Sequence, residues 1–194
     1  MSYDYILKIL ILGDKNVGKT SICKKLISTK FSICEPTMGV DFFSGTFSIC
    51  NNINLKCRFW DLSGDERFKS IIKRYYNNTA LILLVFDLSK NSSFFSLKSW
   101  LTEFREFIKT PYKIILIGNK NDKKIKNVEK YSNFAKNNDL YYFETNAKYD
   151  TEINKKFLNC LEEIYTDSNF IKSCPGIKPM VKFDKNKDNC CYLL

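Results

Sequence analysis

Apolar residues along the chain form short runs typical of strands and wider spacings typical of helices, and the two patterns alternate. The first run, Tyr5–Leu12, is apolar and β-branched, and a glycine-rich turn and a helical pattern from Gly18 to about Ser28 follow it. These residues predict a strand, a loop and a helix. Two further extended segments, Val40–Ile49 and Ile53–Phe59, flank a polar turn at 50–52 and predict a β-hairpin.

Two later runs, Ala80–Phe86 and Lys113–Ile117, are apolar almost throughout, as expected for strands that helices cover on both faces. Helical spacing recurs in two sets of apolar residues that we interpret as core packing: Phe94, Leu97, Leu101, Phe104 and Ile108, then Ile153, Phe157, Leu161 and Ile164. The alternation predicts an α/β fold, with a mostly parallel sheet and helices on both of its faces. Such a fold binds ligands beyond the carboxyl ends of its strands.

The length of 194 residues suits one domain with a short appendage, and a hydrophobic fraction of 44% excludes a disordered chain. No apolar run approaches the roughly 20 residues that a membrane-spanning helix requires. Periodicity stops near Asp167, and a stretch rich in proline, lysine and asparagine follows. We therefore expect one domain over 1–166 and a flexible tail over 167–194.

Charge and cysteine content narrow the function classes. The formal net charge of +10 would suit a nucleic acid or an anionic membrane surface. The lysines are scattered among asparagines, however, which biased nucleotide composition also produces, and without an arginine-aromatic stripe we expect no nucleic-acid partner.

The eight cysteines lack CxxC spacing and the chain has no histidine, so we expect small buried thiols and no zinc site. The first residues, Met1–Ile6, lack a secretory leader and a myristoylation glycine, so we expect an intracellular protein.

A phosphate-binding loop lies between the first strand and the first helix. Gly13–Thr20 fits the pattern G-x-x-x-x-G-K-[ST] in the context that this pattern requires. The glycines let backbone amides close around phosphate oxygens, Lys19 reaches the β and γ phosphates, and Thr20 can ligate Mg²⁺. A glycine turn with a surface lysine is the alternative. The residues assigned to this loop are Gly13, Asp14, Lys15, Asn16, Val17, Gly18, Lys19, Thr20 and Ser21.

Asp61 and Gly64, which come after the third predicted strand, complete the expected phosphate chemistry. Asp61 follows the strand that ends at Phe59-Trp60 and is placed to hold Mg²⁺, although alone it could equally be a turn residue. Gly64 is small enough for its backbone N–H to approach a γ-phosphate and sense its presence.

The chain resembles the Rab proteins of the Ras superfamily of small GTPases over about residues 5–166 and in its tail. Besides the phosphate loop, the segments that carry the resemblance are Thr37-Met38-Gly39-Val40-Asp41-Phe42, Trp60-Asp61-Leu62-Ser63-Gly64-Asp65-Glu66-Arg67-Phe68, Tyr75-Tyr76, Leu84-Val85-Phe86-Asp87, Asn119-Lys120-Asn121-Asp122 and Glu144-Thr145-Asn146-Ala147-Lys148. The resemblance implies a P-loop small GTPase fold with a six-stranded sheet, GTP/GDP and Mg²⁺ as cofactors, and a switch that recruits effectors to membranes in vesicle trafficking. It also implies an exchange factor, a GTPase-activating protein and a prenylation escort as partners.

The base site favours guanine on chemical grounds. The Asp122 carboxylate can accept hydrogen bonds from both N1–H and the exocyclic amino group of guanine, an arrangement that adenine does not offer. This argues against a P-loop ATPase. The resemblance implies the other contacts: Asn119 fixes the loops, Lys120 packs over the base, the Ala147 backbone N–H meets O6, Phe31 stacks on the base, Asn146 and Lys148 belong to the base loop, and Thr37 closes over Mg²⁺ and the γ-phosphate.

Three aromatic residues, Phe42, Trp60 and Tyr75, match the surface that Rab proteins present to effectors, and ordinary packing under the switches is the equal alternative. The residues assigned to hydrolysis are Lys19, Thr37, Gly64 and Asp65, and those assigned to Mg²⁺ are Thr20, Thr37 and Asp61.

The sequence departs from the family pattern at Asp65, where glutamine usually orients the attacking water. An ionised aspartate accepts hydrogen bonds only, is shorter, and brings negative charge toward a polyanion. Slow intrinsic hydrolysis is therefore our hypothesis, and a non-hydrolysing GTP-binding scaffold is the alternative. Lys15 and Asn16 replace small residues common in this loop, Asn146 replaces a serine, and 31–37 is about one residue shorter than usual.

The carboxyl terminus resembles a prenylation signal. Cys190 and Cys191 match the double-cysteine ends on which Rab proteins carry geranylgeranyl groups, and the last four residues also fit a CaaX box. Two lipid chains would anchor the protein stably, whereas one would need help from the tail lysines. We expect the cytoplasmic face of an intracellular membrane, in exchange with the cytosol. Two unmodified cysteines are the alternative.

Overall fold

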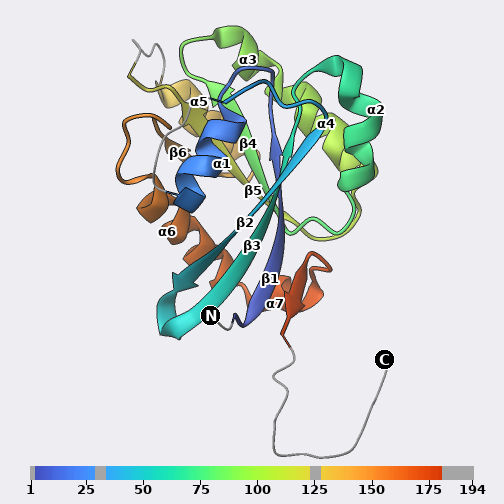
Figure 1. Ribbon diagram of the computed structural model, residues 1–194, viewed down its shortest axis with the longest axis vertical. Helices are drawn as coiled ribbons and strands as arrows, with labels where there is room; N and C mark the ends of the chain where they lie inside the picture. Colours follow the sequence, from blue (N-terminus) through green and yellow to red (C-terminus); the bar gives the residue numbers. More distant parts are fainter. Residues whose placement is uncertain (1–2, 29–33, 123–127, 181–194) are drawn as a thin grey trace, which may run out of the picture.

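The computed structural model describes residues 3–28, 34–122 and 128–180, and it forms a central sheet with helices on both faces (Figure 1). The strands are β1 Tyr5–Leu12, β2 Val40–Ile49, β3 Ile53–Leu62, β4 Leu81–Asp87, β5 Lys113–Asn119, β6 Tyr141–Glu144 and β7 Ile177–Pro179. The α-helices are α1 Lys19–Ser28, α2 Lys69–Ile72, α3 Asn91–Phe95, α4 Leu97–Phe107, α5 Val128–Asn137, α6 Ile153–Thr166 and α7 Ser168–Ser173. Short 3₁₀ turns are η1 Cys50–Asn52, η2 Glu66–Phe68 and η3 Lys73–Tyr75.

The sheet has the order β2-β3-β1-β4-β5-β6, in which only β2 is antiparallel to its neighbour. This confirms the α/β class and the mostly parallel sheet, but the expected number of six strands is wrong, because β7 also pairs with β1 and makes seven. The hairpin of β2 and β3 runs from the pair Val40 and Leu62 to the pair Ile49 and Ile53. The turn between them lies at Cys50–Asn52, as predicted. Asn51 and Asn52 have φ values of 58° and 57° there, a region that asparagine enters more readily than most residues.

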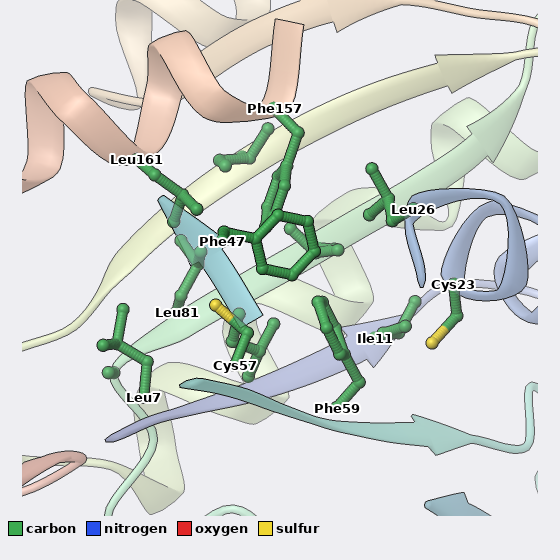
Figure 2. Close-up of a cluster of buried hydrophobic side chains, with 14 of the residues drawn as sticks. Leu7, Ile11, Cys23, Leu26, Phe47, Cys57, Phe59, Leu81, Phe157 and Leu161 are labelled. Carbon is green, nitrogen blue, oxygen red and sulfur yellow. The ribbon is translucent and has the colours of Figure 1, made fainter. Parts of the chain in front are cut away.

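Side chains of the inner strands alternate between two cores. In β1, Ile9 and Ile11 face the core beneath α1 and α6, whereas Leu10 and Leu12 face the core beneath α4 and α5. This burial on both faces explains why the inner strands are continuous apolar runs. Figure 2 shows the first core, where Phe47, Phe59 and Phe157 converge from β2, β3 and α6, with centroids of Phe47 and Phe157 5.2 Å apart.

The cysteines partly match expectation. Cys23, Cys57 and Cys174 are buried thiols, whereas Cys34 and Cys160 are partly buried and Cys50 is exposed. Cys23 and Cys57 belong to the core of Figure 2.

The chain beyond Asp167 differs from the expected flexible tail, and that expectation is wrong for 168–179. Asp167 accepts a hydrogen bond from the Phe170 backbone N–H at 3.0 Å and caps α7, and β7 pairs antiparallel with β1 as a seventh strand. The backbone of Gly176 packs so closely that a Cβ there would lie 2.3 Å from the Ala80 nitrogen. A six-residue helix and a three-residue strand are too short to show periodicity, and their burial comes from tertiary contacts.

Among the helices of the described residues, none is long and apolar enough to cross a membrane.

Candidate nucleotide-binding site

The phosphate loop joins the carboxyl end of β1, a strand inside the sheet, to the first residue of α1. Gly13 and Gly18 have φ values of 137° and 98°, which side-chain-bearing residues rarely adopt. A Cβ on Gly13 would lie 2.1 Å from the Val85 carbonyl oxygen, and one on Gly18 would lie 2.2 Å from Asn119 Nδ2. Both glycines are therefore required, Gly13 by the backbone of β4 and Gly18 by the Asn119 side chain at the end of β5.

Lys19 lies beneath this loop as a buried cation. Its side chain is 6% exposed, and its ammonium donates to the carbonyl oxygens of Gly13 and Asp14, both at 2.9 Å. Burial lowers the pKa of Lys19 to about 8, although Asp61 and Asp14 oppose this shift. The group remains mostly protonated at neutral pH, so it presents positive charge at the amino terminus of α1.

Thr20, Thr37 and Asp61 converge from three separate segments. The two threonine hydroxyls lie 3.0 Å apart, Thr20 donates to Asp61 Oδ2, and Thr37 Oγ1 lies 3.1 Å from that oxygen. Asp61 is fully buried, and its second oxygen has no hydrogen-bond partner among the residues that the structure describes. Burial raises the pKa of Asp61, and the Thr20 hydrogen bond and the charge of Lys19 oppose this. Hard oxygen donors around an unsatisfied buried carboxylate fit Mg²⁺, which prefers such ligands and completes its shell with water and phosphate.

Gly64 and Asp65 lie directly against the phosphate loop. A Cβ on Gly64 would lie 2.4 Å from the Asp14 carbonyl carbon and the Lys15 nitrogen. The Asp65 carboxylate accepts from Arg67 Nε at 3.0 Å and Nη2 at 2.7 Å, from the Arg67 backbone N–H at 3.1 Å and from Lys15 Nζ at 3.4 Å. These hydrogen bonds, those of Arg67 first, hold the pKa of Asp65 well below its usual range. Asp65 is ionised, and both of its oxygens already have protein partners.

Asn119 connects the phosphate loop to the base loop. Its side chain, 2% exposed, donates to the Val17 carbonyl at 2.8 Å and accepts from the Ala147 backbone N–H at 3.1 Å. Next to it, the Asn146 amide donates to Asp122 Oδ1 and accepts from the Lys148 backbone N–H at 2.9 Å. The predicted base-site residues that the structure describes at 119–122 and 146–148 therefore meet in one place.

Lys120 lies between the base loop and the phosphate loop. Its ammonium donates to the Asn16 carbonyl at 2.8 Å and pairs with Asp87 Oδ2 at 2.7 Å. Burial would raise the pKa of Asp87, but hydrogen bonds from Lys120 and Ser89 outweigh it and lower that pKa. Asp87 is not among the site residues predicted from the sequence, although its place at the carboxyl end of a buried strand is a usable signal.

A second unassigned contact is the hydrogen bond from Trp100 Nε1 on α4 to Asp14 Oδ1, at 2.9 Å. No sequence pattern distinguishes this tryptophan from its buried neighbours. It holds the outer side of the phosphate loop.

These parts surround a cavity of about 610 Å³ between the phosphate loop, the 34–38 segment and the 63–68 segment. The predicted residues that line it are Lys15, Asn16, Gly18, Lys19, Thr20, Ser21, Thr37, Gly64, Asp65 and Lys120. Asp122, Asn146, Ala147 and Lys148 gather beyond Lys120 and do not line it. Phe31, Cys190 and Cys191 lie outside the described residues.

The fold and the phosphate loop together define an α/β protein of the P-loop class. A family model described as "Ras family" matches residues 8–166. Curated relatives include "Ras-related protein Rab-2B" of Dictyostelium discoideum, 33% identical over 91% of this chain and 87% of the relative. "Ras-related protein RABA1c" of Arabidopsis thaliana is 30% identical, and "Ras-related protein YPTC6" of Chlamydomonas reinhardtii is 33% identical, each over 84% of this chain and 77% of the relative.

The chain therefore belongs to the Ras family, as a small GTPase of the Rab group. Membership supports guanine nucleotide binding, generally with Mg²⁺, and GTPase activity in general terms.

Proposed function

We propose that this protein is a GTP/GDP switch that recruits effectors to membranes in vesicle trafficking, and that it hydrolyses GTP slowly on its own. The observation that carries this proposal is that the Thr37 hydroxyl contacts both the Thr20 hydroxyl and the Asp61 carboxylate. Thr37 precedes β2 and belongs to a different segment from the phosphate loop. A change at the nucleotide can therefore reach the surface around β2 through this one side chain.

The hydrolysis chemistry follows from the residues around the cavity. Lys19 and the loop amides would bind phosphate oxygens, and Thr20, Thr37 and Asp61 would hold Mg²⁺, which would neutralise phosphate charge. An attacking water needs a group that orients it. Asp65 is the residue at that position, but it cannot donate, and Arg67 and Lys15 occupy its oxygens. The chain alone therefore orients water poorly, and an activating protein would have to supply the missing group.

The hydrogen bonds from Arg67 and Lys15 to the Asp65 carboxylate also favour the second candidate, a GTP-binding scaffold that does not hydrolyse GTP. A single-turnover assay separates the two: GTP-loaded protein receives Mg²⁺, and GDP formation is followed beside an Asp65→Gln variant. Slow but measurable turnover in the wild type, faster in the variant, supports the switch. No turnover in the wild type over many hours supports the scaffold. Equal rates in both proteins would show that Asp65 does not limit hydrolysis.

Exposed apolar side chains at 38–42 and in the segment 71–75 support an effector-binding role. Phe42 is 55% exposed and packs edge to face on Trp60, with ring centroids 5.0 Å apart. Met38 and Ile71 are also exposed, and Tyr75 is half-buried. Trp60 packs inward, as the packing interpretation expects, whereas Phe42 stays accessible, as an effector contact would require. Exposed apolar groups of this kind are typical of protein-binding surfaces.

Membrane attachment through Cys190 and Cys191 is part of the same proposal, and it supports a location on the cytoplasmic face of an intracellular membrane. Intact-mass measurement of the protein from a prenylating host tests it. One or two geranylgeranyl additions that disappear in a Cys190→Ser/Cys191→Ser variant support the anchor, and an unmodified mass contradicts it. Comparing each single variant counts the lipids.

A further inference from the structure

The two residues that depart most from the family pattern around the phosphates contact each other. Lys15 Nζ lies 3.4 Å from Asp65 Oδ2, with side chains 51% and 16% exposed, and both line the nucleotide cavity. The resemblance gives an uncharged residue at each of these positions. Here a cation on the phosphate loop faces an anion on the 63–68 segment.

The contact follows from the close packing of Gly64 on the phosphate loop. Because the Gly64 backbone leaves no space for a Cβ against Asp14 and Lys15, the next residue is brought to the edge of the loop. The Asp65 carboxylate lies there between Lys15 and Arg67.

The two cations hold Asp65 unequally. Arg67 makes three hydrogen bonds to the carboxylate, at 2.7 to 3.1 Å, whereas Lys15 makes one at 3.4 Å. A bidentate guanidinium is the stronger partner, and a half-exposed ammonium on a flexible stem is the weaker one. Lys15 can therefore leave Asp65 for another anion without leaving the carboxylate unpaired.

Neighbouring contacts give the direction in which Lys15 faces. On one side, the Asn16 carbonyl accepts from Lys120, next to the base-binding residues. On the other side lie Gly64 and Asp65. A nucleotide with its base near Lys120 extends its phosphate chain away from the base loop, so the phosphate that meets Lys15 beside Asp65 is the terminal one.

We propose that Lys15 discriminates GTP from GDP: it exchanges its contact with Asp65 for the terminal phosphate of GTP, and Asp65 holds it when that phosphate is absent. This inference rests on the proposed nucleotide switch. Asp65, which Arg67 continues to hold, then competes with the phosphate for Lys15.

The test is a competition assay on the full chain, loaded throughout with fluorescently labelled GDP in the presence of Mg²⁺. The label is displaced by unlabelled GDP or by a GTP analogue with a β–γ imido bridge, and the ratio of the two affinities is measured. We expect Lys15→Met, which keeps the length and removes the charge, to lower the preference for the analogue about tenfold. Lys15→Arg restores most of it, and Asp65→Asn, which removes the competing charge, raises it about threefold.

A matched control is Lys98→Met, since Lys98 is an exposed lysine on α4 outside this cavity and its loss changes net charge equally. If Lys15→Met weakens both nucleotides equally, or leaves the ratio within about twofold, Lys15 does not discriminate. If Asp65→Asn leaves the ratio unchanged, the exchange with Asp65 is refuted. Failure of wild-type protein to bind either guanine nucleotide overturns the proposed function instead, so the two failures are distinguishable.

Discussion

Asn119→Ala tests whether one buried side chain holds the phosphate loop and the base loop together. The substitution removes two hydrogen bonds, to the Val17 carbonyl at 2.8 Å and from the Ala147 N–H at 3.1 Å. Both groups belong to buried residues, and a buried polar group left without a partner costs about 1–3 kcal/mol. We therefore expect a loss of about 2–6 kcal/mol in the free energy of unfolding, and a melting temperature lower by at least about 4 °C.

Calorimetry at fixed GDP and Mg²⁺ concentrations measures this loss, because bound nucleotide itself shifts the melting temperature. Release of fluorescent GDP should also accelerate, since the two loops lose their common support. Asn121→Ala is the matched control, because its side chain is exposed and its backbone N–H bond to Thr145 survives the substitution. A loss below about 0.5 kcal/mol for Asn119→Ala, or an equal loss for both variants, would refute the reasoning.

Three further predictions concern acid stability, the end of the folded chain and the surface. The pKa of Asp150 is lowered, because hydrogen bonds from Lys156 (Nζ to Oδ2 2.8 Å) and Thr145 outweigh the effect of burial. The lowered pKa of Asp150 contributes folding stability that is present above the ordinary pKa of 3.8 and is lost as pH falls through the lowered value. Lys156→Met should therefore make the free energy of unfolding depend less on pH in this acid range, as measured by denaturation at a series of pH values. Phe170→Ala should lower the free energy of unfolding, measured by chemical denaturation, by about 3 kcal/mol, because the ring is buried in the core. A change near zero would mean that α7 is not packed against the core and belongs to a flexible tail. Phe42→Ala should change stability by less than about 1 kcal/mol and leave GDP affinity unchanged, while effector capture by the GTP-analogue form is lost; retained capture would exclude this ring as a contact.

The sequence by itself determined the elements with long, regular patterns and the residues with fixed spacing. The apolar runs set β1, β4 and β5, because strands buried on both faces need apolar residues at nearly every position. The spacing within 13–20 placed the phosphate loop, because glycine conformations and a lysine at the helix start are local requirements. Family comparison confirms the resulting class.

Only the tertiary structure decided which residues far apart in the sequence contact one another. The helix and strand after Asp167 exist because Phe170 and Ile177 find space against the sheet, which no local periodicity reveals. The pairing of Lys15 with Asp65, 50 residues apart, depends on the packing of a backbone against the phosphate loop. Sequence chemistry named the charges correctly, but only the fold determines which charges lie close enough to compete.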